Sequence, residues 1–112
     1  MKIKEVTEEH ILFDNGREIT FSHEQDCCEC NYADFTQITP ETVGYDQEFV
    51  EPLAFSFIDG KGFRFGNYAR YGISNPIFVP CYSDQNGYYS SDINVHYNGE
   101  CIIIMECEER LD

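Results

Sequence analysis

The sequence predicts a mainly β fold: an antiparallel curled sheet or partly closed barrel with at most a short helix, an α+β arrangement being the alternative. Apolar and polar residues alternate over several short stretches, as they do on half-buried strands. Turn signals built on glycine recur every ten to twenty residues. No stretch shows the spacing of an amphipathic helix over several turns.

The first elements are a strand and a hairpin. They are expected over residues 2–6, His10–Phe13 and Glu18–His23. The pair Asn15-Gly16 between the hairpin arms supplies the positive φ angles that a tight turn needs. Alternation along the second arm puts His23 on the core face with Ile19 and Phe21.

The middle of the chain is less regular. Residues 32–47 predict a loop with one or two turns of helix near Thr39-Pro40, because Thr caps helices and Pro favours their first turn. Alternation returns over Phe49–Phe57, with Phe63–Phe65 as the start of the next strand. These two stretches predict a second hairpin around the turn at 59–62.

The following stretch is expected to be irregular, and the last third to be a hairpin. Over 67–80, Tyr68 and Tyr71 are expected to cover a sheet edge, and Pro80 to stop a short strand. The last hairpin has arms over 89–97 and 100–108, joined by Asn98-Gly99. Apolar residues on both faces of 100–108 predict a central strand that is covered on both sides.

The totals indicate one cytoplasmic domain over residues 1–112. No run approaches the roughly 18 apolar residues of a membrane span, and the start lacks a signal-peptide pattern. The six cysteines are therefore expected to be reduced thiols. With 21 acidic against 7 basic residues, net charge −14, direct binding to nucleic acid or a membrane is not expected. Scattered acids mainly favour solubility, although a basic partner is conceivable.

The densest group of reactive side chains lies at residues 23–30, which read His-Glu-Gln-Asp-Cys-Cys-Glu-Cys. A zinc site would use His23, Cys27, Cys28 and Cys30, which supply the right ligand atoms. On an extended strand, however, Cys28 and Cys30 point away from the other two. A small structural metal-binding module is therefore an alternative hypothesis.

A cysteine-dependent enzyme is a second alternative, with Cys27 or Cys28 as nucleophile and His23 as base. The flanking carboxylates, among them Glu24 and Asp26, would raise a thiol pKa, whereas a nucleophile needs a lowered one. A purely structural role is the third reading. Reduced cysteines pack as small apolar residues, and their polar neighbours can satisfy backbone groups at a turn.

A second polar stretch, residues 83–90, reads Ser-Asp-Gln-Asn-Gly-Tyr-Tyr-Ser. Residues 23–29 and this stretch resemble the signatures H-x-Q-D-C-C-E and S-x-x-N-G-Y-Y-S of a family of small, uncharacterised phage and bacterial proteins. The order of the two signatures matches, as does the Asp-Asn-Gly turn before the first. The resemblance implies a shared fold and a shared functional region, without an established activity.

The chain also departs from that family. Where the family usually carries an acidic, helix-like stretch after the cysteine pair, residues 30–36 read Cys-Asn-Tyr-Ala-Asp-Phe-Thr. A further strand over 100–108 follows the second signature. A partner surface built on the acidic stretch is therefore not inferred for this chain.

The two signatures together predict a binding site. We expect them to meet as the two sides of a small cleft, because packing alone poorly explains matching polar residues at two separate places. Tyrosines suit such a site, since they combine apolar area with a hydroxyl group. The expected site residues are His23, Gln25, Asp26, Cys27, Cys28, Asn86, Tyr88 and Tyr89. The resulting hypothesis is a phage-type accessory protein that binds a protein or small ligand, without catalysis, cofactor or metal.

Overall fold

The computed structural model describes residues 1–22, 31–42, 45–83 and 92–109, and it confirms a mainly β fold built from antiparallel sheets. The strands of the described residues are β1 (Ile3–Val6), β2 (His10–Phe13), β3 (Glu18–Ser22), β4 (Asn31–Ala33), β5 (Ala54–Ile58), β6 (Gly62–Ala69), β7 (Gly72–Ser83), β8 (Asp92–Tyr97), β9 (Glu100–Glu106) and β10 (Glu108–Glu109). The only helix in this part is a 3-10 turn, η1 (Phe35–Gln37).

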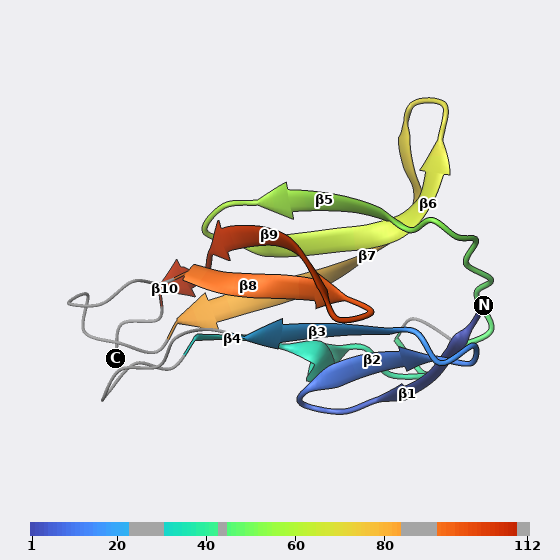
Figure 1. Cartoon of the computed structure of the whole chain (residues 1–112), viewed down its shortest axis with the longest axis horizontal. Coiled ribbons are helices and arrows are strands. Elements are labelled where there is room, and N and C mark those ends of the chain that lie inside the picture. Colours follow the sequence, from blue (N-terminus) through green and yellow to red (C-terminus); the bar gives the residue numbers. More distant parts are fainter. Residues whose placement is uncertain (23–30, 43–44, 84–91, 110–112) are drawn as a thin grey trace.

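The strands form two sheets that lie against each other (Figure 1). The first sheet has the order β1-β2-β3-β8-β9, and the second has the order β10-β7-β6-β5 with β4 also paired to β7. The described pairs are antiparallel except for β10 and β7, which run parallel. Because β9 belongs to the first sheet and β10 to the second, the chain crosses between the sheets at Cys107.

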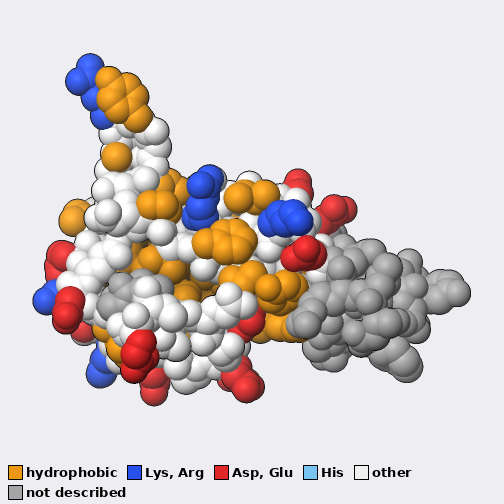
Figure 2. Space-filling view, turned by 180° about the vertical axis from the view of Figure 1, so that it is seen from behind, with side chains coloured by type: hydrophobic (Ala, Val, Ile, Leu, Met, Phe, Trp, Pro, Cys, Tyr) orange, Lys and Arg blue, Asp and Glu red, His pale blue; other side chains and the backbone are white. Residues whose placement is uncertain are grey.

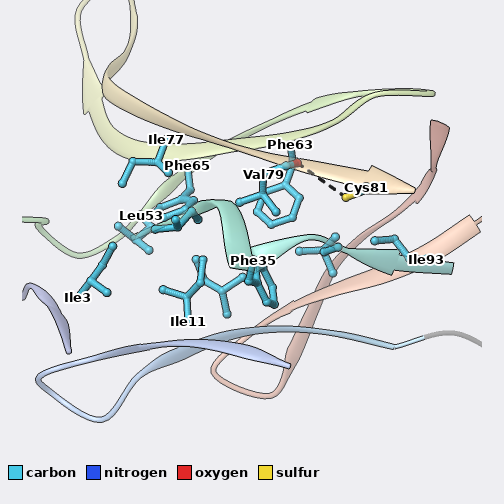
Figure 3. Packing of buried hydrophobic residues seen from close by; sticks show 14 of the residues in the cluster. Ile3, Ile11, Phe35, Leu53, Phe63, Phe65, Ile77, Val79, Cys81 and Ile93 are labelled. Atoms are coloured by element: carbon cyan, nitrogen blue, oxygen red, sulfur yellow. Dashed lines mark hydrogen bonds between the residues drawn. The ribbon is translucent and has the colours of Figure 1, made fainter. Parts of the chain in front are cut away.

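One hydrophobic core fills the space between the sheets (Figure 3). It takes alternate residues from the inner face of each sheet, as half-buried strands require. The fully buried members include Ile11, Phe13, Ile19, Ile93 and Val95 from the first sheet, and Phe63, Phe65, Val79 and Cys81 from the second. Phe35 of η1 is also fully buried, with its ring 5.7 Å from that of Phe21. The short helix thus adds an aromatic side chain to the core.

The two Asn-Gly turns lie where the sequence predicts them. Asn98 and Gly99 have φ angles of 53° and 84° and join β8 to β9. Gly16 has a φ of 89° in the turn between β2 and β3, which the Phe13 N–H closes by donating to the Arg17 carbonyl at 2.8 Å. Positive φ angles are easy for glycine and asparagine, which explains why these turns could be predicted.

The expectation that Pro80 stops a short strand is wrong. Strand β7 extends over twelve residues and includes Pro80, which pairs with Gly62 of β6. Proline lacks an N–H, but its carbonyl can still take part in a ladder. Here the Pro80 carbonyl accepts a hydrogen bond from the Asp34 N–H at 2.8 Å. Beyond Pro80 the strand pairs with β4, so it continues to Ser83.

The expectation that Tyr68 and Tyr71 cover a sheet edge is also wrong. Residues 67–74 continue β6 and β7 as a hairpin, which we call the arm, and it projects from the body of the molecule (Figure 1). The two tyrosine side chains are 70% and 92% exposed. A break in the strand register between Phe65 and Asn67 marks the base of the arm. Such irregularities bend a strand, which explains the change of direction.

Two further expectations need correction. Strand β9 is not covered on both sides: it is the last strand of the first sheet, and Ile102 and Ile104 are 37% and 62% exposed. The opposite face does turn inward, since Met105 and Cys107 are buried. In the described part of residues 32–47, the one helical turn is η1, which lies before Thr39, and residues 39–42 form a hydrogen-bonded turn.

Candidate functional site

All eight expected site residues lie outside the described part of the chain. His23, Gln25, Asp26, Cys27 and Cys28 fall within residues 23–30, and Asn86, Tyr88 and Tyr89 fall within residues 84–91. We call these two stretches the signature segments. The strands on either side of them are described, and they fix where each segment leaves and rejoins the fold.

These four strand ends lie together. The first signature segment links the end of β3 to the start of β4, and the second links the end of β7 to the start of β8. Asn31, the first residue of β4, is paired with Ser83, the last residue of β7. Ser22, at the end of β3, is paired with Asn94 of β8. The described strand ends that flank both segments therefore lie at the same end of the two-sheet body (Figure 1).

A buried polar contact holds this end together. The Ser83 hydroxyl donates a hydrogen bond to Asn31 Oδ1 at 2.5 Å, and both residues are almost completely buried. In the next register position, the rings of Tyr32 and Tyr82 lie 5.9 Å apart. The sequence analysis included Ser83 only as the first residue of the second signature, and it did not predict β4, because a three-residue strand is too short to show alternation. We call the hydrogen-bonded pair of Asn31 and Ser83 the polar anchor.

A cleft of about 450 Å³ lies beside this end, where β3, β4 and η1 meet the β1–β2 turn. Aromatic side chains and carboxylates line it together. Its lining residues are Glu8, Glu9, Phe21, Tyr32, Ala33, Asp34, Phe35 and Thr36. We call it the acidic cleft. Phe21 and Tyr32 are the described neighbours of the first signature segment, since they lie one residue inside the strand ends that flank it.

The carboxylates of the acidic cleft differ in their bonding. Asp34 accepts hydrogen bonds from the Thr36 N–H at 3.2 Å and from the Gln37 side chain at 3.0 Å, so it caps the short helix. Glu8 and Glu9 make no side-chain hydrogen bond or ion pair with any other described residue. Carboxylates beside aromatic rings favour a ligand that carries a cationic group next to apolar atoms.

The described thiols are poor candidates for nucleophilic chemistry. Cys81 and Cys107 are buried, and they lie next to each other because the residues that follow them, Tyr82 and Glu108, are paired. A hydrogen bond to Cys107, together with burial, raises the pKa of the Cys81 thiol far above its usual range. A thiol of this kind stays protonated and unreactive. Cys101 is exposed on the edge strand β9.

The described histidines belong to surface contacts within the first sheet. His10 lies 3.0 Å from a carboxylate oxygen of Glu5 and 3.5 Å from one of Glu18. His96 lies 2.8 Å from the Ser22 hydroxyl. Both rings are partly buried and hydrogen-bonded, so they are less solvated than the alternation of their strands suggests. Within the described residues, no three His, Cys, Asp or Glu side chains converge as metal ligands.

Comparisons with protein-family models, curated proteins and solved structures find no match for this chain. Membership of the phage and bacterial family with the two signatures therefore stays a prediction. In the ranges that the structure describes, no helix is long and apolar enough to cross a bilayer.

Proposed function

We propose that this chain is a binding protein whose recognition surface is the end of the fold that carries both signature segments. The observation that supports this proposal is the pairing of Asn31 with Ser83, next to that of Ser22 with Asn94. These pairs bring the strand ends that flank the two signature segments to one end of the fold. Segments that connect rigid strands are where binding residues commonly lie.

The acidic cleft suggests the chemistry of the ligand. Glu8 and Glu9 are exposed carboxylates without a described partner, and Phe21 and Tyr32 lie in the same cleft. We infer a ligand with one or two cationic groups beside an apolar or aromatic group, such as a basic peptide segment of a partner protein. The net charge of −14 adds a long-range attraction for such a ligand.

Binding is favoured over catalysis by the charges around the signature cysteines. Glu24, Asp26 and Glu29 are neighbours of Cys27 and Cys28 in the sequence. Their negative charge opposes formation of a thiolate, which a cysteine nucleophile requires. We accordingly propose a phage-type accessory protein that works in the cytoplasm by holding its partner.

The proposal can be tested with a defined probe and full-length protein labelled with ¹⁵N. The probe is a capped pentapeptide, Lys-Leu-Phe-Leu-Lys, and its control has glutamine in place of both lysines. We expect the lysine peptide to shift the amide signals of Phe21 and Tyr32, and to bind several-fold more tightly than its control. Equal binding of the two peptides would contradict the proposed ligand chemistry.

Variants separate the cleft from the signature segments. Glu8→Gln combined with Glu9→Gln should weaken the lysine peptide, whereas the exposed pair Asp46→Asn and Glu106→Gln removes the same charge elsewhere and should not. Tyr88→Ala and Gln25→Ala test the segments and should weaken binding while the circular dichroism spectrum is kept. If both segment variants bind like the wild type, the segments do not form the recognition surface.

A further inference from the structure

A second surface has the opposite charge to the rest of the chain. Residues 60–83 contain no acidic residue but three of the seven bases, Lys61, Arg64 and Arg70, in a protein with 21 acids. This stretch supplies all of β6 and all of β7, which lie at the centre of the second sheet. The outer face of that sheet is therefore the surface whose charge best suits contact with an anionic group.

Strand register builds a short polar and aromatic row across this outer face. Phe63 and Phe65 are fully buried in the core, so Arg64 between them points outward. Arg64 pairs with Ser56 of β5 on one side and with Phe78 of β7 on the other. Side chains that are directly opposite in neighbouring strands share one face. Phe78 is 43% exposed, so part of its ring is accessible on this face.

Figure 2 shows the molecule from the side opposite to that seen in Figure 1. Blue and orange side chains lie next to each other below the projecting arm, and most red side chains lie towards the margins of the described surface. The arrangement agrees with the acid-free stretch of the sequence. A cationic and apolar surface of this kind differs from the mixed, mainly acidic surface elsewhere.

A pocket of about 310 Å³ lies where the arm meets this face. Its lining comes from the sheet and from the arm: Ser56, Arg64, Tyr71, Gly72, Ile73 and Pro76. We call it the arginine pocket. It shares no lining residue with the acidic cleft, so it is a separate site.

The Arg64 guanidinium has unused hydrogen-bonding capacity. Its Nη2 donates to the Ser56 hydroxyl at 3.2 Å, and no described carboxylate forms an ion pair with it. Two other described cations are paired: Arg17 lies 2.7 Å from Glu51, and Lys61 lies 3.4 Å from Glu108. A guanidinium has five N–H donors arranged in a fork that matches a carboxylate. Arg64 can therefore receive an anion from outside the chain.

The base of the arm holds the pocket wall in place. A Cβ atom on Gly66 would lie 2.6 Å from the Ser74 carbonyl oxygen and 2.7 Å from Ile73 Cγ2, so only glycine allows this close approach. This close approach holds the returning strand of the arm, with Ile73, against β6 at the base of the arm. At the tip, Arg70 stacks on Tyr71 with 5.5 Å between its guanidinium carbon and the ring centre. The arm thus adds the side chains of Tyr71 and Ile73 to the pocket lining, and Arg70 contacts the Tyr71 ring.

We propose that the arginine pocket binds a carboxylate of a partner protein, presented in a short and otherwise apolar segment. Arg64 would hold the carboxylate in two parallel hydrogen bonds, and the exposed Phe78 and Tyr71 would pack against the apolar neighbours. The segment carries few charges, because the net charge of −14 repels a polyanion at long range. A nucleic acid, with one charge per phosphate, fits three cations poorly.

The test uses full-length ¹⁵N-labelled protein and two capped tetrapeptides, Leu-Phe-Glu-Leu and Leu-Phe-Gln-Leu. We expect the glutamate peptide to shift the amide signals of Ser56, Arg64 and Phe78, and to bind about tenfold more tightly than the glutamine peptide, as charged hydrogen bonds do. Equal binding of the two, or no shift at several millimolar glutamate peptide, would overturn the proposal.

Variants and two further probes complete the test. Arg64→Gln should reduce the affinity about tenfold and Arg64→Lys by less, because lysine keeps the charge but lacks the fork. Lys4→Gln is the matched control, since Lys4 is an exposed cation on β1, and it should bind normally. An equal loss in Lys4→Gln overturns the assignment to Arg64. Tighter binding of a ten-nucleotide oligo-dT, or self-association that Arg64→Gln abolishes, would overturn the proposed partner class.

Discussion

The polar anchor offers the sharpest test of how the fold supports its proposed recognition surface. Ser83→Ala removes the hydroxyl that donates to Asn31 Oδ1, in a place from which water is excluded. Losing one partner of a buried hydrogen bond costs about 1–3 kcal/mol. At the middle of that range, the loss should lower the Tm of a domain of this length by about 8 °C. Thermal unfolding followed by circular dichroism measures this shift.

The matched control for this prediction is Ser56→Ala. It removes the same group from a strand, but the Ser56 hydroxyl is only half-buried and contacts an exposed arginine. We expect it to cost less than about 0.5 kcal/mol. A double-mutant cycle with Asn31→Ala should show a coupling free energy of about 1 kcal/mol, because the hydrogen bond between the two side chains is lost only once in the double variant. If Ser83→Ala costs no more than Ser56→Ala, the anchor does not stabilise this end of the fold.

Three further predictions follow from the core, the pKa of a tyrosine and the thiols. Phe35→Ala should cost about 3–5 kcal/mol in chemical denaturation, because its ring is fully buried; a cost below about 1 kcal/mol would exclude a place in the core. Burial, and then the hydrogen bond to Glu51, raises the pKa of Tyr97 above its usual 10.0. The folded state therefore favours the protonated phenol. The stabilisation that results is present in full below pH 10 and is lost progressively as the pH rises above 10. The wild type should lose stability more steeply than Tyr97→Phe as the pH rises above 10, and parallel curves would refute the assignment. In native protein, iodoacetamide should modify Cys101 much faster than Cys81, as read by peptide mapping; equal rates would show that Cys81 is accessible.

Sequence patterns predicted the fold class because the local signals agree with the tertiary structure. The pairs Asn15-Gly16 and Asn98-Gly99 set tight turns through backbone angles, which do not depend on distant residues. Strand β9 shows the limit. Apolar residues on both of its faces look like double coverage, but the neighbours of a strand are set by the whole topology, and Ile104 remains exposed at the sheet edge.

The candidate sites were less predictable, for a related reason. The two signature segments could be singled out by composition, but the pairing of Asn31 with Ser83 joins residues 52 positions apart. No local pattern reports such a pairing. Arg64 was expected on a strand, without any sign that Ser56 and Phe78 would lie on either side of it. Those neighbours come from a register that only the folded sheet defines.

The crossing of the chain at Cys107 has a consequence for how this protein is made. Met105 and Cys107 are buried in the core, and β10 then joins the second sheet beside β7. While a ribosome still holds these late residues, the core between the sheets lacks the side chains of Met105 and Cys107, and the second sheet lacks β10. Chains dominated by such distant pairings fold slowly. We therefore expect the nascent polypeptide to become resistant to protease only after residue 109 has emerged from the exit tunnel.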